Sequence, residues 1–105
     1  MWPGEDKLFN PNGQVFLKLW NSGNLVLKDG SSILWSTGSA GINPKNARMQ
    51  PNGNLALYDT DRNQVFTSGT NRNQGALLYV KDDGNLVIQD SSGTTIWNIK
   101  GSFDK

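Results

Sequence analysis

An internal repeat constrains this chain more than any other feature of its sequence. Three similar stretches follow one another, and each contains the triplet Gly-Asn-Leu. The asparagines of these triplets are Asn24, Asn54 and Asn85, so they are spaced by 30 and 31 residues. A unit of this size cannot bury an apolar face alone, so the three units are expected to share one core. The sequence therefore predicts a single domain, residues 1–105, built from a first, a second and a third unit at roughly 8–38, 39–69 and 70–100.

The pattern inside each unit is typical of β-strands. The segments "NLVL", "NLAL" and "NLVI" alternate in period two and are bounded by Asn-Gly, Asp-Gly, Ser-Gly or Asp/Ser clusters, which favour tight turns. No apolar stripe at helical spacing continues past a turn signal. The sequence thus predicts an all-β fold, with strands at 14–20, 24–28, 32–36, 46–50, 54–58, 63–67, 76–81, 85–89 and 94–99, and less defined strands near the N-terminus and at 39–43.

A large aromatic residue follows each repeated asparagine by 11 or 12 residues. These residues are Trp35, Phe66 and Trp97. Three units sharing one core are most simply arranged as three small antiparallel sheets about a pseudo-threefold axis. Because aromatic side chains contribute much of a small core's buried area, we expect these three to meet near that axis as packing residues.

Composition and charge exclude several classes of function. The chain contains neither cysteine nor histidine, so disulfides, thiol catalysis and the usual metal ligands are not expected, and no cofactor is predicted. The net charge is +1 and the basic residues are scattered singly, which argues against nucleic acid as a partner. No apolar stretch approaches the roughly 20 residues that a membrane span needs.

Paired acidic residues are the only candidates for catalysis. They are Asp82-Asp83 and Asp59 with Asp61, and all four lie in segments that resemble turns. We interpret them as solvated turn residues, so an enzyme is not predicted. The N-terminus lacks the basic start and apolar run of a signal peptide. The chain is therefore expected either to remain inside the cell or to begin after a removed leader, and its localisation stays open.

A row of polar side chains distinguishes the stretch "QPNGNLALY" of the second unit. Strand alternation places Gln50, Asn52, Asn54, Ala56 and Tyr58 on the face opposite the apolar residues. Amides supply a hydrogen-bond donor and an acceptor in one group, which suits the hydroxyls of a neutral sugar. The alternative is that an outward strand face is polar in any case and that asparagine favours turns.

These residues carry a resemblance to a known family. The pattern Gln-x-Asp-x-Asn-x-Val-x-Tyr, repeated three times with an aromatic residue downstream, resembles that of the bulb-type (snowdrop-type) mannose-binding lectins. The resemblance spans nearly the whole chain, from "GEDKLFNPNGQVFLKL" to "TTIWN". It implies the β-prism II fold, with three four-stranded sheets and up to three sugar sites. In that family, Asp and Asn bind the mannose O2, Gln binds O3, Tyr binds O4 and Val contacts the ring.

The second unit resembles the family pattern most closely. Gln50, Asn54 and Tyr58 match it, whereas Asn52 replaces the aspartate and Ala56 the valine. An asparagine keeps an acceptor oxygen but loses the charge-assisted bond, which is about twice as strong as a neutral one. The resemblance therefore implies a weak site.

The other two units depart further from the pattern. The third unit keeps three of the positions and changes the two outer ones, and the first unit keeps only two. The degenerate third-unit set is Lys81, Asp83, Asn85, Val87 and Gln89. The first unit keeps Asn24 and Val26, with Trp20, Ser22 and Lys28 at the other positions, which predicts a lost site or one remade around Trp20.

The leading hypothesis is a lectin that binds mannose-type glycans or glycoproteins weakly and multivalently. The alternative is a protein-interaction or structural domain that kept the fold and lost the sugar. The resemblance also implies a homodimer formed by exchange of the C-terminal strand, for which "TTIWNIKGSFDK" is long enough.

Overall fold

The computed structural model describes residues 1–4 and 7–100. This part of the chain contains β-strands and no helix, and therefore no helix long and apolar enough to cross a membrane. The strands within it are β1 (Lys7–Phe9), β2 (Val15–Leu19), β3 (Leu25–Asp29), β4 (Ser32–Ser36), β5 (Pro44–Met49), β6 (Leu55–Asp59), β7 (Gln64–Thr67), β8 (Leu77–Val80), β9 (Leu86–Gln89) and β10 (Thr95–Asn98).

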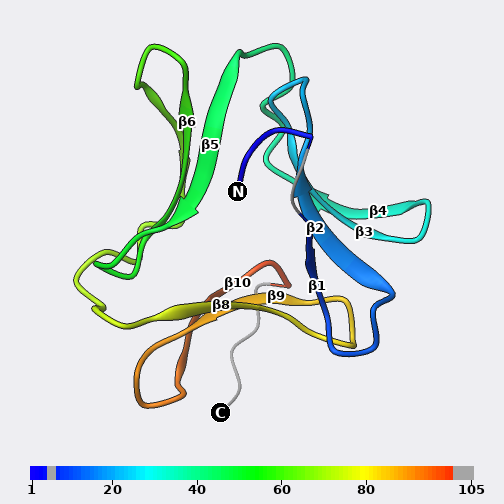
Figure 1. Cartoon of the computed structure of the whole chain (residues 1–105). Coiled ribbons are helices and arrows are strands. Elements are labelled where there is room, and N and C mark those ends of the chain that lie inside the picture. Colours follow the sequence, from blue (N-terminus) through cyan, green and yellow to red (C-terminus); the bar gives the residue numbers. More distant parts are fainter. Residues whose placement is uncertain (5–6, 101–105) are drawn as a thin grey trace.

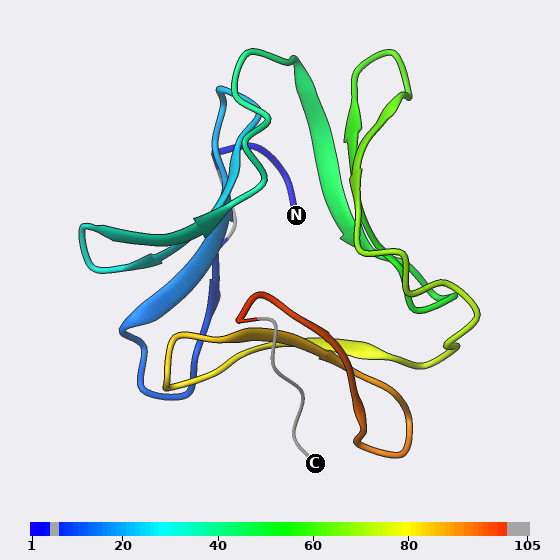
Figure 2. The same ribbon diagram turned by 180° about the vertical axis from the view of Figure 1, so that it is seen from behind.

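Three antiparallel sheets enclose the core like the sides of a triangle (Figures 1 and 2). The first sheet has the order β1-β2-β3-β4, the second β5-β6-β7, and the third β10-β9-β8. Each sheet comes from one of the three units, because short turns join strands that are consecutive in the chain. The predicted all-β fold of three antiparallel sheets is confirmed.

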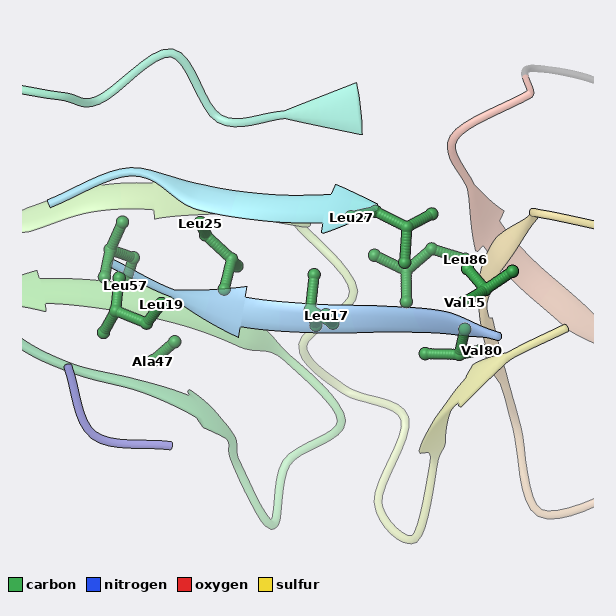
Figure 3. Packing of buried hydrophobic residues seen from close by; sticks show 9 residues of the cluster. All are labelled: Val15, Leu17, Leu19, Leu25, Leu27, Ala47, Leu57, Val80 and Leu86. Atoms are coloured by element: carbon green, nitrogen blue, oxygen red, sulfur yellow. The ribbon is translucent and has the colours of Figure 1, made fainter. Parts of the chain in front are cut away.

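The apolar parity of every central strand faces the inside of the triangle. On β3, for example, Leu25 and Leu27 are fully buried, while Lys28 is half-buried on the opposite parity. Figure 3 shows how these side chains converge from all three sheets. The buried cluster consists of Val15, Leu17, Leu19, Leu25, Leu27, Ala47, Leu57, Val80 and Leu86.

The three repeated aromatic residues meet as predicted. The ring centroids of Trp35 and Phe66 are 5.7 Å apart, those of Trp35 and Trp97 5.9 Å, and those of Phe66 and Trp97 6.3 Å. All three pairs pack edge to face, the geometry that the charge distribution of aromatic rings favours. One ring comes from each sheet, so this aromatic triad (Trp35, Phe66 and Trp97) ties the sheets together.

The glycine of each Gly-Asn-Leu triplet turns the chain into a central strand. Gly23, Gly53 and Gly84 have φ values of 95°, 90° and 84°, a region that other residues rarely adopt. At Gly53 a side chain would also overlap the backbone oxygen of Asn73. These turns fix where the asparagine of each triplet enters its sheet.

Two expectations about strands differ from the structure. The first sheet has the predicted four strands, but the described parts of the second and third sheets have three each. In the second sheet, Met1 takes the place beside β5 by forming two hydrogen bonds with Ala47. The Met1 ammonium donates to the Ala47 oxygen at 2.8 Å, and the Met1 oxygen accepts from the Ala47 amide at 3.0 Å. Residues 39–43, predicted as a weak strand, form a loop instead, because the Gly41 amide is bonded to the Ser22 oxygen at 2.7 Å rather than to a strand partner.

Candidate functional site

The polar row of the second unit lies on the outer face of the second sheet. Its centre is Ala56 on β6, which is in register with the exposed residues Arg48 on β5 and Thr67 on β7. Ala56 itself is 0% exposed, so its methyl group forms a covered floor between larger neighbours. The outward parity holds, but this floor offers no free apolar surface.

The two ends of the row contact each other. The side-chain amide of Gln50 donates from Nε2 to the hydroxyl oxygen of Tyr58 at 2.9 Å. This bond uses one donor of the glutamine and one lone pair of the phenol. The Gln50 carbonyl oxygen remains an acceptor and the Tyr58 hydroxyl remains a donor, so the pair still presents both functions to a ligand.

Asn54 is held by the last residue of β7 and by the segment that follows it. Its Oδ1 accepts from Thr67 Oγ1 at 2.9 Å, from Ser68 Oγ at 3.1 Å and from the Thr70 amide at 3.2 Å. We call this arrangement the asparagine clip. Asn54 is 7% exposed, and the three donors fix the orientation of its side chain. The amide oxygen is therefore used internally, and only the Nδ2 donor of Asn54 remains for a ligand.

Asn52 caps the turn that leads into β6. Its Oδ1 accepts from the backbone amide of Asn54 at 3.0 Å, which is an Asx turn. Because only the oxygen can accept, this bond settles which way the amide points. The group left outside is the Nδ2 donor. The resemblance to the family predicts that this asparagine keeps an acceptor for the sugar, but here that acceptor belongs to the backbone.

The predicted residues of the third unit line one hollow on the outer face of the third sheet. Its volume is about 400 Å³. Val87 is 4% exposed and lies at the floor, in the position that Ala56 has in the second sheet. The lining residues are Lys81, Asp82, Asp83, Asn85, Val87, Gln89, Thr95 and Asn98.

The third unit has the same Asx turn but no asparagine clip in its described part. Asp83 Oδ1 accepts from the Asn85 amide at 3.0 Å, and Asp83 Oδ2 lies 3.9 Å from Lys100 Nζ. The second carboxylate oxygen therefore remains an acceptor. Asn85 Oδ1 is buried, yet within the described residues it has no hydrogen-bond partner. Ile99 and Lys100 stand where the second unit has Ser68 and Gly69, so the clipping hydroxyl is absent.

The first unit brings Trp20 and Lys28 together where the family has its glutamine and tyrosine. The clip is present, because Asn24 Oδ1 accepts from Thr37 Oγ1 and from the Ser39 amide, both at 3.2 Å. The glutamine position holds Trp20 and the tyrosine position holds Lys28, whose Nζ lies 5.5 Å from the centroid of the Trp20 ring. Val26 at the centre is 4% exposed.

Sequence reasoning missed the residues that hold the site from behind. These are the hydroxyls of the clip, Thr67, Ser68 and Thr70, and the cavity-lining residues Thr95 and Asn98. A signal for the clip is present in the sequence: "STGS" and "TSGT" occupy matching places in the first two units, and "NIKG" replaces them in the third.

Known proteins share this architecture. No protein-family model matches the chain. Among solved structures, a lectin of Marasmius oreades has a TM-score of 0.84 and 30% identity, over 93% of this chain and 82% of that one. A monomeric mannose-binding lectin of the monocot Gastrodia elata has a TM-score of 0.76 and 31% identity, over 95% of this chain and 94% of that one.

A relative in Arabidopsis thaliana is a G-type lectin S-receptor-like serine/threonine-protein kinase. It is 28% identical over 101 residues, which are 90% of this chain but only 13% of the kinase. The similarity to the kinase thus concerns a small part of a much larger protein. The solved lectins, in contrast, match over most of both chains, with TM-scores of 0.84 and 0.76. The chain therefore belongs to the bulb-type mannose-binding lectin family.

Proposed function

We propose that this chain is a carbohydrate-binding domain that binds mannose-type glycans on the outer faces of the second and third sheets. The observation that carries the proposal is the convergence of all five third-unit positions on one hollow of about 400 Å³. This hollow is mostly polar at its rim, open to solvent and floored by Val87. Such a combination suits a sugar ring, which has hydroxyls at its edge and C–H groups on its face.

The second-unit site supports the same function with a different set of side chains. Gln50, Asn54 and Tyr58 supply acceptors and donors in positions that the clip and the Gln50–Tyr58 bond hold in place. Asn52 supplies a donor where the family has a carboxylate. Each site lacks part of the family pattern, so the affinity of a single site is low, and binding to a branched glycan gains strength from several sites at once.

Two substitutions, one at the half-buried Gln50 and one at the exposed Asp83, test the sites separately. Gln50→Ala removes the acceptor of the second site, and Asp83→Asn removes the charged acceptor of the third. Gln74→Ala, an exposed change outside both sites, is the control. We expect either site variant to weaken binding to an immobilised neutral mannan and the double variant to abolish it, while the control binds like the parent chain. Amide chemical shifts on titration with methyl α-mannoside should move near the site that remains.

An unchanged mannan affinity in the double variant would contradict the proposal. If the parent chain binds no neutral glycan but retains a protein partner through the same faces, the protein-interaction hypothesis takes its place. No specific observation in the structure favours that alternative over sugar binding.

The unpaired edge of β8 supports the dimer proposal. Leu77 and Tyr79 are 56% and 40% exposed on this strand, which has no neighbour on one side within the described residues. Open strand edges of this kind pair readily with another strand. Residues 101–105 of the exchanging segment lie outside the described residues. Sedimentation of the parent chain and of Leu77→Lys should show a dimer that the charge on β8 disrupts.

A further inference from the structure

Lysines and aromatic rings alternate on the outer face of the first sheet. Lys7 on β1 is in register with Lys18 on β2, and in the next row Phe9 and Phe16 are in register with Lys28 on β3. Trp20 follows directly after β2. We call this surface the lysine–aromatic face; its residues are Lys7, Phe9, Phe16, Lys18, Trp20 and Lys28.

The rings hold the ammonium groups in place. Lys7 Nζ lies 4.8 Å from the centroid of the Phe16 ring, and Lys18 Nζ lies 4.2 Å from that of Trp20. Lys28 approaches the same tryptophan at 5.5 Å. Cation–π contacts at these distances restrict a flexible lysine chain without neutralising its charge. The lysine side chains have therefore already lost part of their conformational entropy, so a ligand that binds them causes a smaller further loss.

The lysines of this face are not neutralised by ion pairs with the described residues. None of its three lysines forms an ion pair within residues 1–4 and 7–100, where the ion pair that does occur, Lys100 with Asp83, belongs to the third sheet. Asn24 lies beside the face, and its Oδ1 is used by the clip. The side chains of Lys18, Lys28 and Asn24 thus offer a ligand only donors, and two of them are cations.

Side chains that offer only donors, two of them cations, favour an acceptor-rich, negatively charged ligand. A neutral sugar would need acceptors as well, as the second and third sites provide. We propose that the lysine–aromatic face binds acidic glycans, whose carboxylate or sulfate groups pair with Lys18 and Lys28, the two lysines that Trp20 positions. Single-stranded nucleic acid fits less well, because base stacking needs open ring faces and the ammonium groups lie over these rings.

This inference does not depend on mannose binding. The face lies on the first sheet and depends on Lys18 and Lys28, whereas the proposed mannose sites lie on the other two sheets and share no residue with it. Failure of one proposal therefore leaves the other standing, and the same preparation can be tested for both.

The test compares two double variants that lose the same charge. Lys18→Gln with Lys28→Gln alters the face, while Lys45→Gln with Arg72→Gln removes two exposed cations elsewhere. The probes are polygalacturonate for carboxylate, dextran sulfate for sulfate, and uncharged dextran. Losing two charge-assisted contacts should weaken binding to one or both acidic polymers by about tenfold or more at low salt. The control double variant should stay within about twofold, because distant charges are largely screened.

Three further measurements make the result decisive. Lys18→Arg with Lys28→Arg should restore binding, since arginine keeps the charge. Excess methyl α-mannoside should not displace the acidic polymer, and Gln50→Ala should bind it normally. Equal losses in the two charge-matched variants, or binding to phosphatidylserine vesicles or single-stranded DNA but to neither acidic polymer, would overturn the proposal.

Discussion

The second and third sheets place the same asparagine in two different environments. Asn54 is clipped by two hydroxyls and a backbone amide, whereas the oxygen of Asn85 is buried without a partner in the described part of the chain. The second unit keeps the family's glutamine, asparagine and tyrosine, yet the two outer residues bond to each other. The third unit keeps the aspartate, asparagine and valine instead and leaves a hollow of about 400 Å³. A match of residue types therefore does not by itself give an open site, because neighbouring segments decide which atoms remain free.

The largest expected effect comes from removing the clipped asparagine. Asn54→Ala leaves Thr67, Ser68 and Thr70 without their acceptor in a mostly buried place, so we expect it to lower the free energy of unfolding by about 2–4 kcal/mol. Asn85→Ala removes an oxygen that has no hydrogen-bond partner among the described residues, so it should cost less than about 1 kcal/mol. Thermal and urea denaturation of both variants measure the difference directly.

Asn54→Asp provides the control for this comparison. It keeps an oxygen for the three donors and removes the outward Nδ2, so it should recover much of the stability and still lose the donor at the sugar site. If Asn54→Ala and Asn85→Ala lower the free energy of unfolding equally, the bonds of the clip add nothing to stability.

An intermediate effect, on mannoside affinity, is expected at the Asx turn, where the second site has an amide and the third has a carboxylate. In the second unit the Asx turn leaves the amide donor of Asn52 outside, whereas in the third it leaves a carboxylate oxygen of Asp83. Asn52→Asp should preserve the turn and supply a charged acceptor, which raises mannoside affinity of the second site by about tenfold. Titration of this variant, with Asn43→Asp as an exposed control, would detect the gain. An unchanged affinity would mean that the outward atom at this position does not contact the sugar.

The smallest effect concerns the turn between β6 and β7. The Asn63 amide, the Asn63 side chain and the Asp61 amide donate to the Asp59 carboxylate and hold its pKa below the ordinary value of 3.8. A depressed pKa in the folded state stabilises the fold above the unfolded pKa, and this contribution is lost as pH falls through the folded value. Asp59→Asn should therefore flatten the decline of melting temperature below about pH 4. A decline as steep as that of the parent chain would exclude Asp59 as a source of acid sensitivity.

The architecture could be predicted because it depends on local patterns. Alternation and turn glycines locate the strands within a few residues, and equal spacing predicts that Trp35, Phe66 and Trp97 meet. The orientation of the Asn52 amide could not be predicted, because it depends on a bond to a backbone group. The lysine–aromatic face was missed for another reason: its lysines are scattered along the chain and gather only when strands pair.

The aromatic triad has a consequence for how the molecule loses its structure and how that loss can be observed. Each ring comes from a different sheet, so no sheet can detach without separating at least two ring pairs. Two indoles whose centroids are 5.9 Å apart, nearly perpendicular at 79°, should couple their electronic transitions and give a strong near-ultraviolet dichroic signal. That signal reports the joining of the first sheet to the third, independently of whether either one keeps its own backbone pairing. If it vanishes together with the far-ultraviolet β signal on heating, the three sheets melt as one cooperative unit.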